Sequence, residues 1–162
     1  MTGLVAQVNI SRGGVPKRPI SAGNLTPEGI EGDSQAHPDI HGGPRQAVLL
    51  VTAEGIDELA AAGFPVSPGA LGENITTRGI PRGEGRVGQR WRIGTDATIE
   101  ITKRRAPCAA LNVYGPKFQA SIFDALANAG DPTSPKWGLS GFYASVVVPG
   151  VIRPGDSVVA CE

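Results

Sequence analysis

The sequence predicts a mainly β fold: a closed or partly open β-barrel with a few inserted helices, built as one domain over residues 1–162. Three observations carry this prediction. Several short apolar runs have the length and residue types of strands. The 23 glycines and 14 prolines punctuate the chain as turns, while the apolar content of 40% is that of a folded protein. Many short strands joined by such turns favour a barrel.

The first half of the chain contains two expected strands and one helix. Residues 4–10 alternate apolar and polar side chains, as a strand with one buried face does. The apolar run 46–51 also has the length of a strand. Thr52 is a good N-cap for a helix over 53–62, and Gly63 is placed to end it.

A glycine-rich segment in the middle of the chain resembles a nucleotide-binding motif. Residues 83–88 match the string G-x-G-x-x-G. That motif binds dinucleotides only where a strand precedes it and a helix follows it. Residues 89–94 look like another strand, so we reject the dinucleotide site and expect the glycines to turn a hairpin.

The second half is expected to hold three more strands and one helix. The strands are expected over 97–102, 142–148 and 158–160. Residues 117–127 have helical periodicity, and Gly130 lies just beyond as a stop. The apolar face of this helix would consist of Phe118, Ile122, Phe123 and Leu126.

Composition limits the classes of function. Fifteen Lys or Arg balance 15 Asp or Glu, which argues against broad attraction to nucleic acid or to anionic membranes. Residues 1–10 lack the regions of a signal peptide, and no stretch approaches the ~20 apolar residues of a membrane span. Only Cys108 and Cys161 occur, too few for a disulfide-stapled secreted fold. The sequence therefore predicts a soluble, cytoplasmic protein.

Cys108 is the strongest candidate for chemistry. It follows Lys103, Arg104 and Arg105 at the end of an expected strand, and Pro107 disfavours a continued helix or central strand. The thiol is therefore expected to be presented to solvent. Neighbouring cations favour the thiolate, which is the form that attacks electrophiles and binds metals. The alternative is a small buried apolar side chain, a common environment of free cysteine.

Two pairs of polar residues stand in loops and turns. Lys17 and Arg18 lie on a loop rich in glycine and proline, which is either a solvated loop or an anion site. Glu73 and Asn74 stand between a glycine-flexed turn and a β-branched strand. Asn74 would either stabilise the turn or read a heterocycle, since an amide both donates and accepts hydrogen bonds.

The segment 29–45 concentrates further candidate ligands. His37 and His41 stand four apart, as in helical zinc sites, but a proline between them and Gly42–Gly43 after them disfavour a helix. A loop zinc site that borrows the cysteine is conceivable. The preferred interpretation is that these side chains, with Glu31 and Asp33, stabilise turns or line a pocket. The paired glycines would let the backbone approach a ligand closely.

An ordered set of motifs in this chain resembles the MOSC domain, the family named after the C-terminal domain of the molybdenum cofactor sulfurases. No single motif is diagnostic, but the ordered set is fairly specific and extends from about the first strand to the last. The motifs are Pro16-Lys17, Glu31-Gly32-Asp33, His41-Gly42-Gly43, Gly72-Glu73-Asn74-Ile75, Arg105-Ala106-Pro107-Cys108 and Gly155-Asp156.

The resemblance implies a molybdenum cofactor (molybdopterin). In molybdenum-binding relatives, which include the mitochondrial amidoxime-reducing component, the cysteine matching Cys108 supplies a thiolate ligand to the metal. The asparagine matching Asn74 lies by the pterin, and a lysine near the place of Lys17 helps to hold the cofactor. A soft thiolate suits a redox-active metal, and cations suit the cofactor's phosphate. The other candidate cofactor-binding residues are Arg18, Gly42, Gly43, Glu73 and Arg105.

The activity implied is that of an oxidoreductase. It would reduce a small N-hydroxylated substrate, such as a hydroxylaminopurine, with electrons from a separate redox partner. Glu31, Asp33 and His41 are candidate proton handlers, and turn stabilisation is the competing interpretation. Two alternatives stay open: a sulfur carrier that uses a persulfide on Cys108, and a non-catalytic cofactor-binding module.

The chain also departs from its longer relatives. It lacks the N-terminal β-barrel region of the amidoxime reducers and the aminotransferase-like domain of the sulfurases, so pyridoxal phosphate is not expected. It most resembles the free-standing bacterial branch. An exposed sheet face and the apolar C-terminal strand would tolerate a homodimer, but nothing in the sequence demands one.

Overall fold

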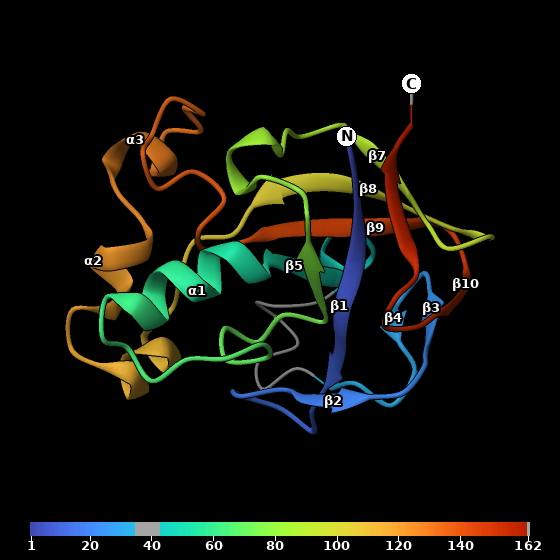
Figure 1. The fold of residues 1–162 in the computed structure, drawn as a ribbon, viewed down its shortest axis with the longest axis horizontal. Coiled ribbons are helices and arrows are strands. Elements are labelled where there is room, and N and C mark those ends of the chain that lie inside the picture. The colour runs from blue at the N-terminus through green and yellow to red at the C-terminus, as the bar shows by residue number, and fades with distance from the viewer. Residues whose placement is uncertain (35–42, 162) are drawn as a thin grey trace.

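Seven strands close a barrel in the computed structural model of the chain, which describes residues 1–34 and 43–161 (Figure 1). Around the ring the order is β1, β11, β7, β8, β9, β5 and β6, and β6 pairs back to β1. The expected mainly β fold is confirmed, with the barrel in its closed form. The barrel strands are β1 (Thr2–Ile10), β5 (Val48–Thr52), β6 (Ile75–Arg78), β7 (Arg90–Ile93), β8 (Ala97–Arg104), β9 (Phe142–Val148) and β11 (Ser157–Ala160).

Smaller elements surround the barrel. One more strand extends its sheet beside β1, three strands form a separate sheet, and the helices gather on one side, at the left of Figure 1. The extra strands are β2 (Arg18–Ile20) on β1, and β3 (Gly23–Thr26), β4 (Gly29–Ile30) and β10 (Gly150–Ile152) in the separate sheet. The helices are α1 (Ala53–Ala61), α2 (Phe118–Ile122) and α3 (Ala125–Asn128), with 3-10 helices η1 (Pro44–Gln46), η2 (Arg82–Glu84) and η3 (Ala109–Tyr114).

The crossover from β5 to β6 delivers two candidate residues to the barrel wall. These two strands run parallel, and a parallel pair needs a long connection, which α1 provides. Thr52 Oγ1 accepts a hydrogen bond from Gly55 N at 3.1 Å, so Thr52 caps α1 as expected. Gly63 follows the helix with a φ of 100°, a conformation that suits glycine. The chain then returns to β6 with Glu73 and Asn74 directly before the strand.

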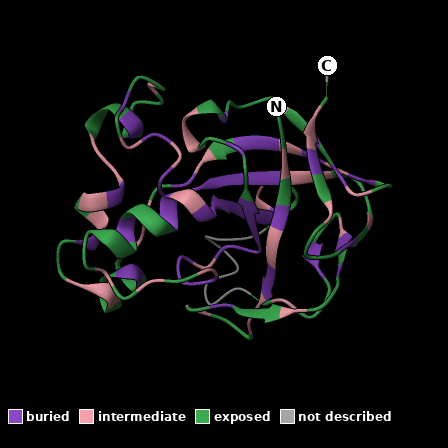
Figure 2. Ribbon diagram, viewed as in Figure 1, coloured by how far each residue is buried: buried purple, intermediate pink, exposed green. Residues whose placement is uncertain are grey.

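Two hydrophobic clusters divide the core. One fills the barrel and contains Leu50, Ile75 and Phe142. The other lies between the barrel wall and the helices and contains Val51 and Phe118. Side chains of a strand alternate between its faces, so β5 contributes to both clusters in turn. Figure 2 shows the result: the barrel strands are largely buried, while the helices bury one side and expose the other.

The structure confirms most of the expected strands. Those expected over 4–10, 46–51, 89–94, 97–102, 142–148 and 158–160 are present, with ends displaced by at most two residues. Strands β2, β3, β4 and β10 carry too little pattern to be expected, because each has two to four residues.

The helix expected over 117–127 is wrong as one element. It is divided into α2 and α3 at Phe123, whose backbone is extended with φ −150° and ψ 143°. Asp124 then begins a new helix by accepting a hydrogen bond from Ala127 N at 2.8 Å. This division turns Leu126 outward, so it is 45% exposed instead of lying on the buried face.

The hairpin expected at 83–88 is also wrong. This segment begins in η2, and the strand that follows, β7, pairs with β8 and β11 rather than with the preceding β6. The turn of the β7–β8 hairpin lies at 94–96, where Gly94 has a φ of 63°. A strand and not a helix follows the glycines, in agreement with the rejection of a dinucleotide site.

Candidate functional site

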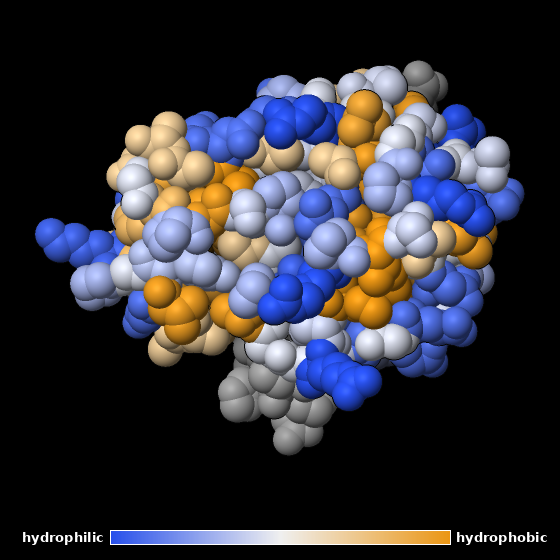
Figure 3. All heavy atoms as spheres, turned by 60° about the horizontal axis from the view of Figure 1, so that its bottom comes forward, coloured by the Kyte–Doolittle hydropathy of each residue, from blue (hydrophilic) through white to orange (hydrophobic). Residues whose placement is uncertain are grey.

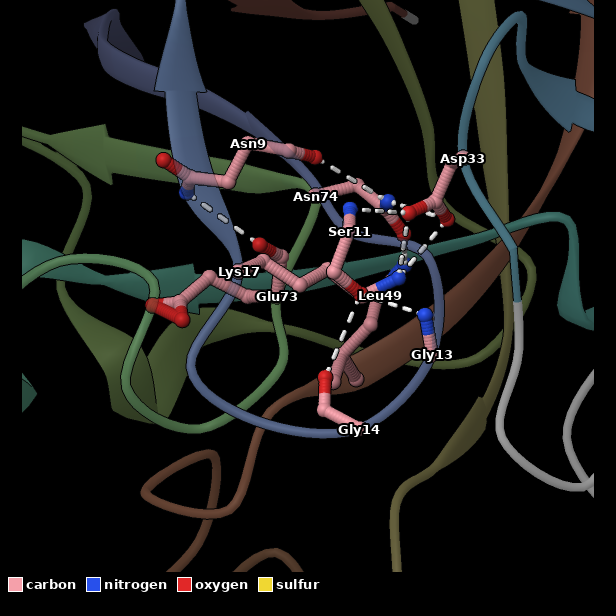
Figure 4. A network of polar contacts seen from close by, with 9 residues as sticks. All are labelled: Asn9, Ser11, Gly13, Gly14, Lys17, Asp33, Leu49, Glu73 and Asn74. Atoms are coloured by element: carbon pink, nitrogen blue, oxygen red, sulfur yellow. Dashed lines mark hydrogen bonds and ion pairs between the residues drawn. The ribbon is translucent and has the colours of Figure 1, made fainter.

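The buried carboxylate of Asp33 binds the side chains of two other candidate residues, Lys17 and Asn74. Asp33 accepts hydrogen bonds from Lys17 Nζ at 2.6 and 2.7 Å, Asn74 Nδ2 at 2.9 Å and Ser11 N at 2.9 Å (Figure 4). The side chains of Lys17 and Asp33 are only 5% and 6% exposed. Lys17 is therefore neither a solvated loop residue nor a free cation, since its charge is neutralised by Asp33.

Asn74 ties the ends of three strands together. Its Nδ2 donates to Asp33 and also, at 3.3 Å, to the carbonyl oxygen of Asn9 at the end of β1. Its Oδ1 accepts a hydrogen bond from Leu49 N in β5 at 3.1 Å. All the polar atoms of the Asn74 amide thus have protein partners, as a buried amide requires. We call Lys17, Asp33 and Asn74 the closed network.

Next to the closed network, Glu73 is completely buried. Burial raises the pKa of its carboxyl to about 7, against the opposing influence of backbone amides and of the Arg105 guanidinium. Among the described atoms, Glu73 Oε1 has no hydrogen-bond partner. Glu73 in turn adds to the effect of burial, which raises the pKa of the Tyr114 hydroxyl.

Arg105 connects this region to residues 105–108, the loop between β8 and η3 that carries Cys108, which we call the cysteine loop. Its guanidinium donates to Leu71 O at 2.9 Å and to Ser140 O at 3.2 Å, and its Nε has no partner among the described atoms. Burial raises the pKa of the Tyr143 hydroxyl, while Arg105 opposes this shift and Cys108 adds to it. Tyr143 thus lies close enough to both Arg105 and Cys108 for each to change the pKa of its hydroxyl.

Cys108 is presented at the surface as expected. It follows β8, stands at the N-cap position of η3, is only partly buried and forms no disulfide. Its carbonyl oxygen accepts from Leu111 N at 3.1 Å, which fixes the start of η3. Lys103 Nζ lies 5.7 Å from the centre of the Tyr143 ring.

One pair of strands links the closed network to the cysteine loop. Leu49 of β5 and Tyr143 of β9 are cross-strand partners. Their neighbours Leu50 and Phe142 point into the barrel, so Leu49 and Tyr143 point outward. Leu49 N binds Asn74, and Tyr143 neighbours Arg105 and Cys108. Candidate residues more than 90 positions apart are therefore brought to one outer face of the barrel wall.

The remaining described candidates make no side-chain hydrogen bond or ion pair with this face. Arg18, Glu31 and Gly43 are exposed. His41 and Gly42 lie outside the described residues, and so does the zinc hypothesis built on His37 and His41. Within residues 1–34 and 43–161, no group of three or more His, Cys, Asp or Glu is placed to hold a metal ion. In the same part of the chain, no helix is long and apolar enough to cross a bilayer.

Two residues of this face were not singled out in the sequence. Tyr143 is the second residue of the apolar strand β9, where an aromatic residue indicates packing more than function. Strand alternation would have placed it outward, beside Leu49, had the pairing of β5 with β9 been known. Ser140, whose hydroxyl is buried without a partner among the described atoms, carries no signal in the sequence.

Comparisons with known proteins agree with this architecture. A family model described as "MOSC domain" matches residues 37–159. An uncharacterized protein, YflK of Bacillus subtilis, is 32% identical over 150 residues, which are 90% of this chain and 62% of the relative. Protein YiiM of Escherichia coli is 33% identical over 135 residues, 79% of this chain and 54% of the relative. The chain thus spans a little more than half the length of these curated relatives.

Solved structures show the same fold. The crystal structure of YiiM from Geobacillus stearothermophilus superposes with a TM-score of 0.72 at 22% identity, covering 99% of this chain and 75% of that chain. The YUAD protein from Bacillus subtilis gives a TM-score of 0.73 at 21% identity, covering 99% and 96%. At these identities the likeness establishes the fold alone.

Proposed function

Because the chain belongs to the MOSC domain family, we propose that it binds a molybdenum cofactor through Cys108 and reduces small N-hydroxylated compounds with electrons from a separate redox partner. The observation that carries this proposal is the position of Cys108. It is a free, partly exposed thiol on the same barrel face as Arg105, Tyr143 and the closed network.

The residues present fit such a group on the cysteine side. A cysteine thiolate is a soft ligand of the kind that suits a redox-active transition metal. Arg105 is buried and positively charged, and its Nε has no partner among the described atoms. The Nε–H group can therefore donate a hydrogen bond to an anionic group. When bound, the cofactor would supply the electron and oxygen-transfer chemistry.

The lysine side fits less directly. Lys17 is expected to hold the cofactor, but Asp33 neutralises its charge, and the Asn74 amide is fully hydrogen-bonded within the protein. In the proposed function these residues fix the loop ends that border the site. Asp33 accepts at both of its oxygens, so its proposed part in proton handling requires one of these bonds to open first.

The proposed reaction needs protons as well as electrons. Reducing R–NH–OH to R–NH₂ and water consumes two electrons and two protons. With a pKa of about 7, Glu73 would exchange a proton near neutral pH, and it neighbours Arg105. Glu31 is exposed and would have to act from the rim of the site.

A sulfur carrier is the second candidate function. A partly exposed free thiol beside Arg105 is also what a transferable persulfide requires, because its outer sulfur must be reached by an acceptor. Mass spectrometry of freshly purified protein would separate the two. A labile added sulfur on Cys108 without molybdenum favours the carrier.

Elemental analysis for molybdenum tests the proposed function. The protein would be purified from a host that makes the pterin cofactor, as wild type, Cys108→Ser and Cys161→Ser. The last variant is a matched control, because Cys161 is the second free cysteine and is exposed near the end of the chain. We expect near-stoichiometric molybdenum in the wild type and in Cys161→Ser, and its loss in Cys108→Ser. Retention of molybdenum by Cys108→Ser contradicts the proposal.

A further inference from the structure

The turn that precedes β6 is bound by several separate parts of the chain. We call residues 68–73 the hub turn. Its donors come from β1, from the loop of Lys17, from the cysteine loop and from η3. The backbone oxygens and their donors are Pro68 O with Gln7 Nε2 at 3.1 Å, Gly69 O with Lys17 N at 2.9 Å, Ala70 O with the Tyr114 hydroxyl, Leu71 O with Arg105 Nη2 at 2.9 Å, and Glu73 O with Asn9 Nδ2 at 3.1 Å. The hub turn therefore holds the Lys17 loop and the cysteine loop at once.

The hub turn is packed closely against its neighbours. Gly69 has a φ of 95°, and a Cβ placed on it would lie 2.2 Å from the carbonyl oxygen of Lys17. Leu71 is completely buried and belongs to the same hydrophobic cluster as Phe118. Close packing of this kind transmits displacements, because no empty space is left to absorb them. A movement of the hub turn must therefore disturb the loops bound to it.

One ionisable side chain lies inside this arrangement. Glu73 is 0% exposed, and its Oε2 accepts a hydrogen bond from Thr76 Oγ1 at 3.4 Å, while its Oε1 has no partner among the described atoms. Burial raises the pKa of this carboxyl to about 7, against the opposing influence of backbone groups in the hub turn and of the Arg105 guanidinium. Below pH 7 the closed hub turn thus contains a neutral carboxyl.

The groups around Glu73 leave it as the one that titrates near neutral pH. Within residues 1–34 and 43–161, the charged or titratable groups that face it are Arg105, from the cysteine loop, and Tyr114, from η3. Burial raises the pKa of the Tyr114 hydroxyl above its ordinary value of 10, so this group stays neutral. Lys17 binds the hub turn through its backbone amide, and Asp33 neutralises its side chain.

Water can reach the Glu73 carboxyl only if the hub turn opens. The connection from α1 to β6, which contains the hub turn, runs along the lower side of the barrel in Figure 1. Figure 3 brings the lower side forward and shows hydrophobic and hydrophilic residues interspersed over it. Glu73 contributes nothing to the surface, because it is completely buried. An opening that hydrates the carboxyl would return its pKa to the ordinary value of 4.5.

We propose that the hub turn is a pH-sensitive switch beside the proposed site: it is closed while Glu73 is neutral, and local opening becomes favourable once Glu73 is charged. Opening releases Arg105 and the Lys17 loop together. This inference rests on the proposed function and names a regulation of its site. Both loops border that site, so a cofactor bound there would be held most firmly at acidic pH.

Thermodynamic linkage gives the direction of the effect. The closed turn binds the proton of Glu73 more tightly than the open turn does, because the pKa is about 7 in the closed turn and 4.5 after hydration. Opening therefore becomes easier as the pH rises from 4.5 to about 7, and it is constant above that value. The charge of Arg105 attracts the carboxylate and limits the effect without reversing it, since the pKa remains raised in its presence.

Hydrogen exchange of the chain at pH 5 and pH 8, followed by mass spectrometry, tests the switch. Fragments 66–74, 13–20 and 103–112 report on the hub turn and its two loops, and fragment 142–148 of β9 reports on global unfolding. Wild type is compared with Glu73→Gln at each pH, so that the intrinsic exchange rate cancels. We expect the ratio of wild-type to Glu73→Gln exchange rates to rise by up to about 70-fold from pH 5 to pH 8 in the first three fragments. These fragments should also exchange faster than β9, as local opening requires.

Two further variants separate charge from contact. Glu84→Gln removes an exposed carboxylate and should exchange like the wild type at both pH values. Tyr114→Phe removes the hydroxyl that binds Ala70 O without changing any charge near neutral pH, so it should speed exchange in the hub turn by a similar factor at pH 5 and pH 8. Unchanged exchange in Tyr114→Phe would show that η3 does not hold the hub turn, and this result counts against the switch.

The remaining outcomes decide the proposal independently of the metal. A ratio that is the same at pH 5 and pH 8, or a hub turn that exchanges no faster than β9, overturns it. So does a response confined to residues 66–74, because the two loops then do not open with the turn. A pH-sensitive hub turn in a chain that binds no molybdenum would support the switch and count against the proposed function. Bound molybdenum with a pH-insensitive hub turn would do the reverse.

Discussion

The closed network and the segment around Cys108, residues 103–117, differ in what surrounds their charged side chains. In the closed network, Lys17 is buried against Asp33, and Asn74 satisfies every polar atom with protein partners. In residues 103–117, Lys103 and Lys117 are exposed and form no ion pair with a described carboxylate. Charges satisfied inside the protein hold structure, whereas charges left open at the surface are available to a ligand. We therefore expect substitutions in the first region to change stability and substitutions in the second to change binding.

The largest effect is expected from Asp33→Ala. This substitution leaves the buried Lys17 ammonium without its counter-charge, which costs about 3–5 kcal/mol of unfolding free energy. Urea denaturation measures the loss. The double variant Lys17→Met/Asp33→Leu removes both charges and should lose less than Asp33→Ala alone. If Asp33→Ala unfolds at the wild-type urea concentration, the closed network does not hold the fold.

The pH dependence of stability is expected to change in Glu73→Gln. Burial raises the pKa of the Glu73 carboxyl to about 7 from its ordinary value of 4.5, so the folded protein binds this proton more tightly than the unfolded chain does. This contribution to stability is fully present below pH 4.5, declines as the pH rises, and is lost above about pH 7. Arg105 and Tyr114 face Glu73 and are unchanged in the variant.

Denaturation at pH 5 and pH 8 checks this expectation. Relative to wild type, Glu73→Gln should gain up to about 3 kcal/mol between the two values, because 1 pKa unit corresponds to about 1.4 kcal/mol. Glu84→Gln, at an exposed position, serves as the control and should follow the wild type. Parallel curves for Glu73→Gln and wild type would show that Glu73 titrates normally.

A smaller loss is expected from Asn74→Ala. It removes the acceptor of Leu49 N and one donor to Asp33, leaving buried groups unpaired at a cost of about 2 kcal/mol. Asn112→Ala is the matched substitution in the segment around Cys108, where the amide is exposed, and should cost less than about 0.5 kcal/mol. Thermal unfolding of both variants compares the two regions directly. Similar losses would remove the distinction between them.

The smallest effect on stability is expected from Cys108→Ser. The side chain is only partly buried and makes no disulfide, so the free energy of unfolding should stay within about 0.5 kcal/mol of wild type. Cys161→Ser should behave in the same way. A loss of 2 kcal/mol or more in Cys108→Ser alone would show that the thiol is a packing group, which is the alternative raised by the sequence.

The barrel could be predicted from sequence because its strongest strands carry local patterns, such as the apolar run of β9. The pairing of Lys17 with Asp33 could not, because it depends on how a loop folds back over a distance of 16 residues. The contact of Asn74 with Asn9 spans 65 residues. Lys17, Asp33 and Asn74 were all candidates from the sequence. Their contacts with one another and with Asn9 become evident only when β1, β5 and β6 are known to be neighbours.

The division between α2 and α3 shows a signal that sequence reading did not use. The apolar residues of 117–127 fit one helical face, so periodicity favoured a single helix. Asp124 is an N-cap residue type inside that stretch, and its carboxylate is fixed by Ser134, ten positions later. A capping residue within an apparently continuous helix therefore predicts a second start only when its distant partner is known.

Closure of the barrel by β1 and β11 has a consequence for the order of folding. Thr2 pairs with Val159, so the contact that completes the ring joins the most distant parts of the chain. During synthesis, residues 2–4 of β1 emerge long before β11 and lack this partner until β11 has been made. Such long-range closure is slow, and an unpaired strand edge is a template for aggregation. Translation speed and chaperone access late in synthesis should therefore govern the yield of folded protein.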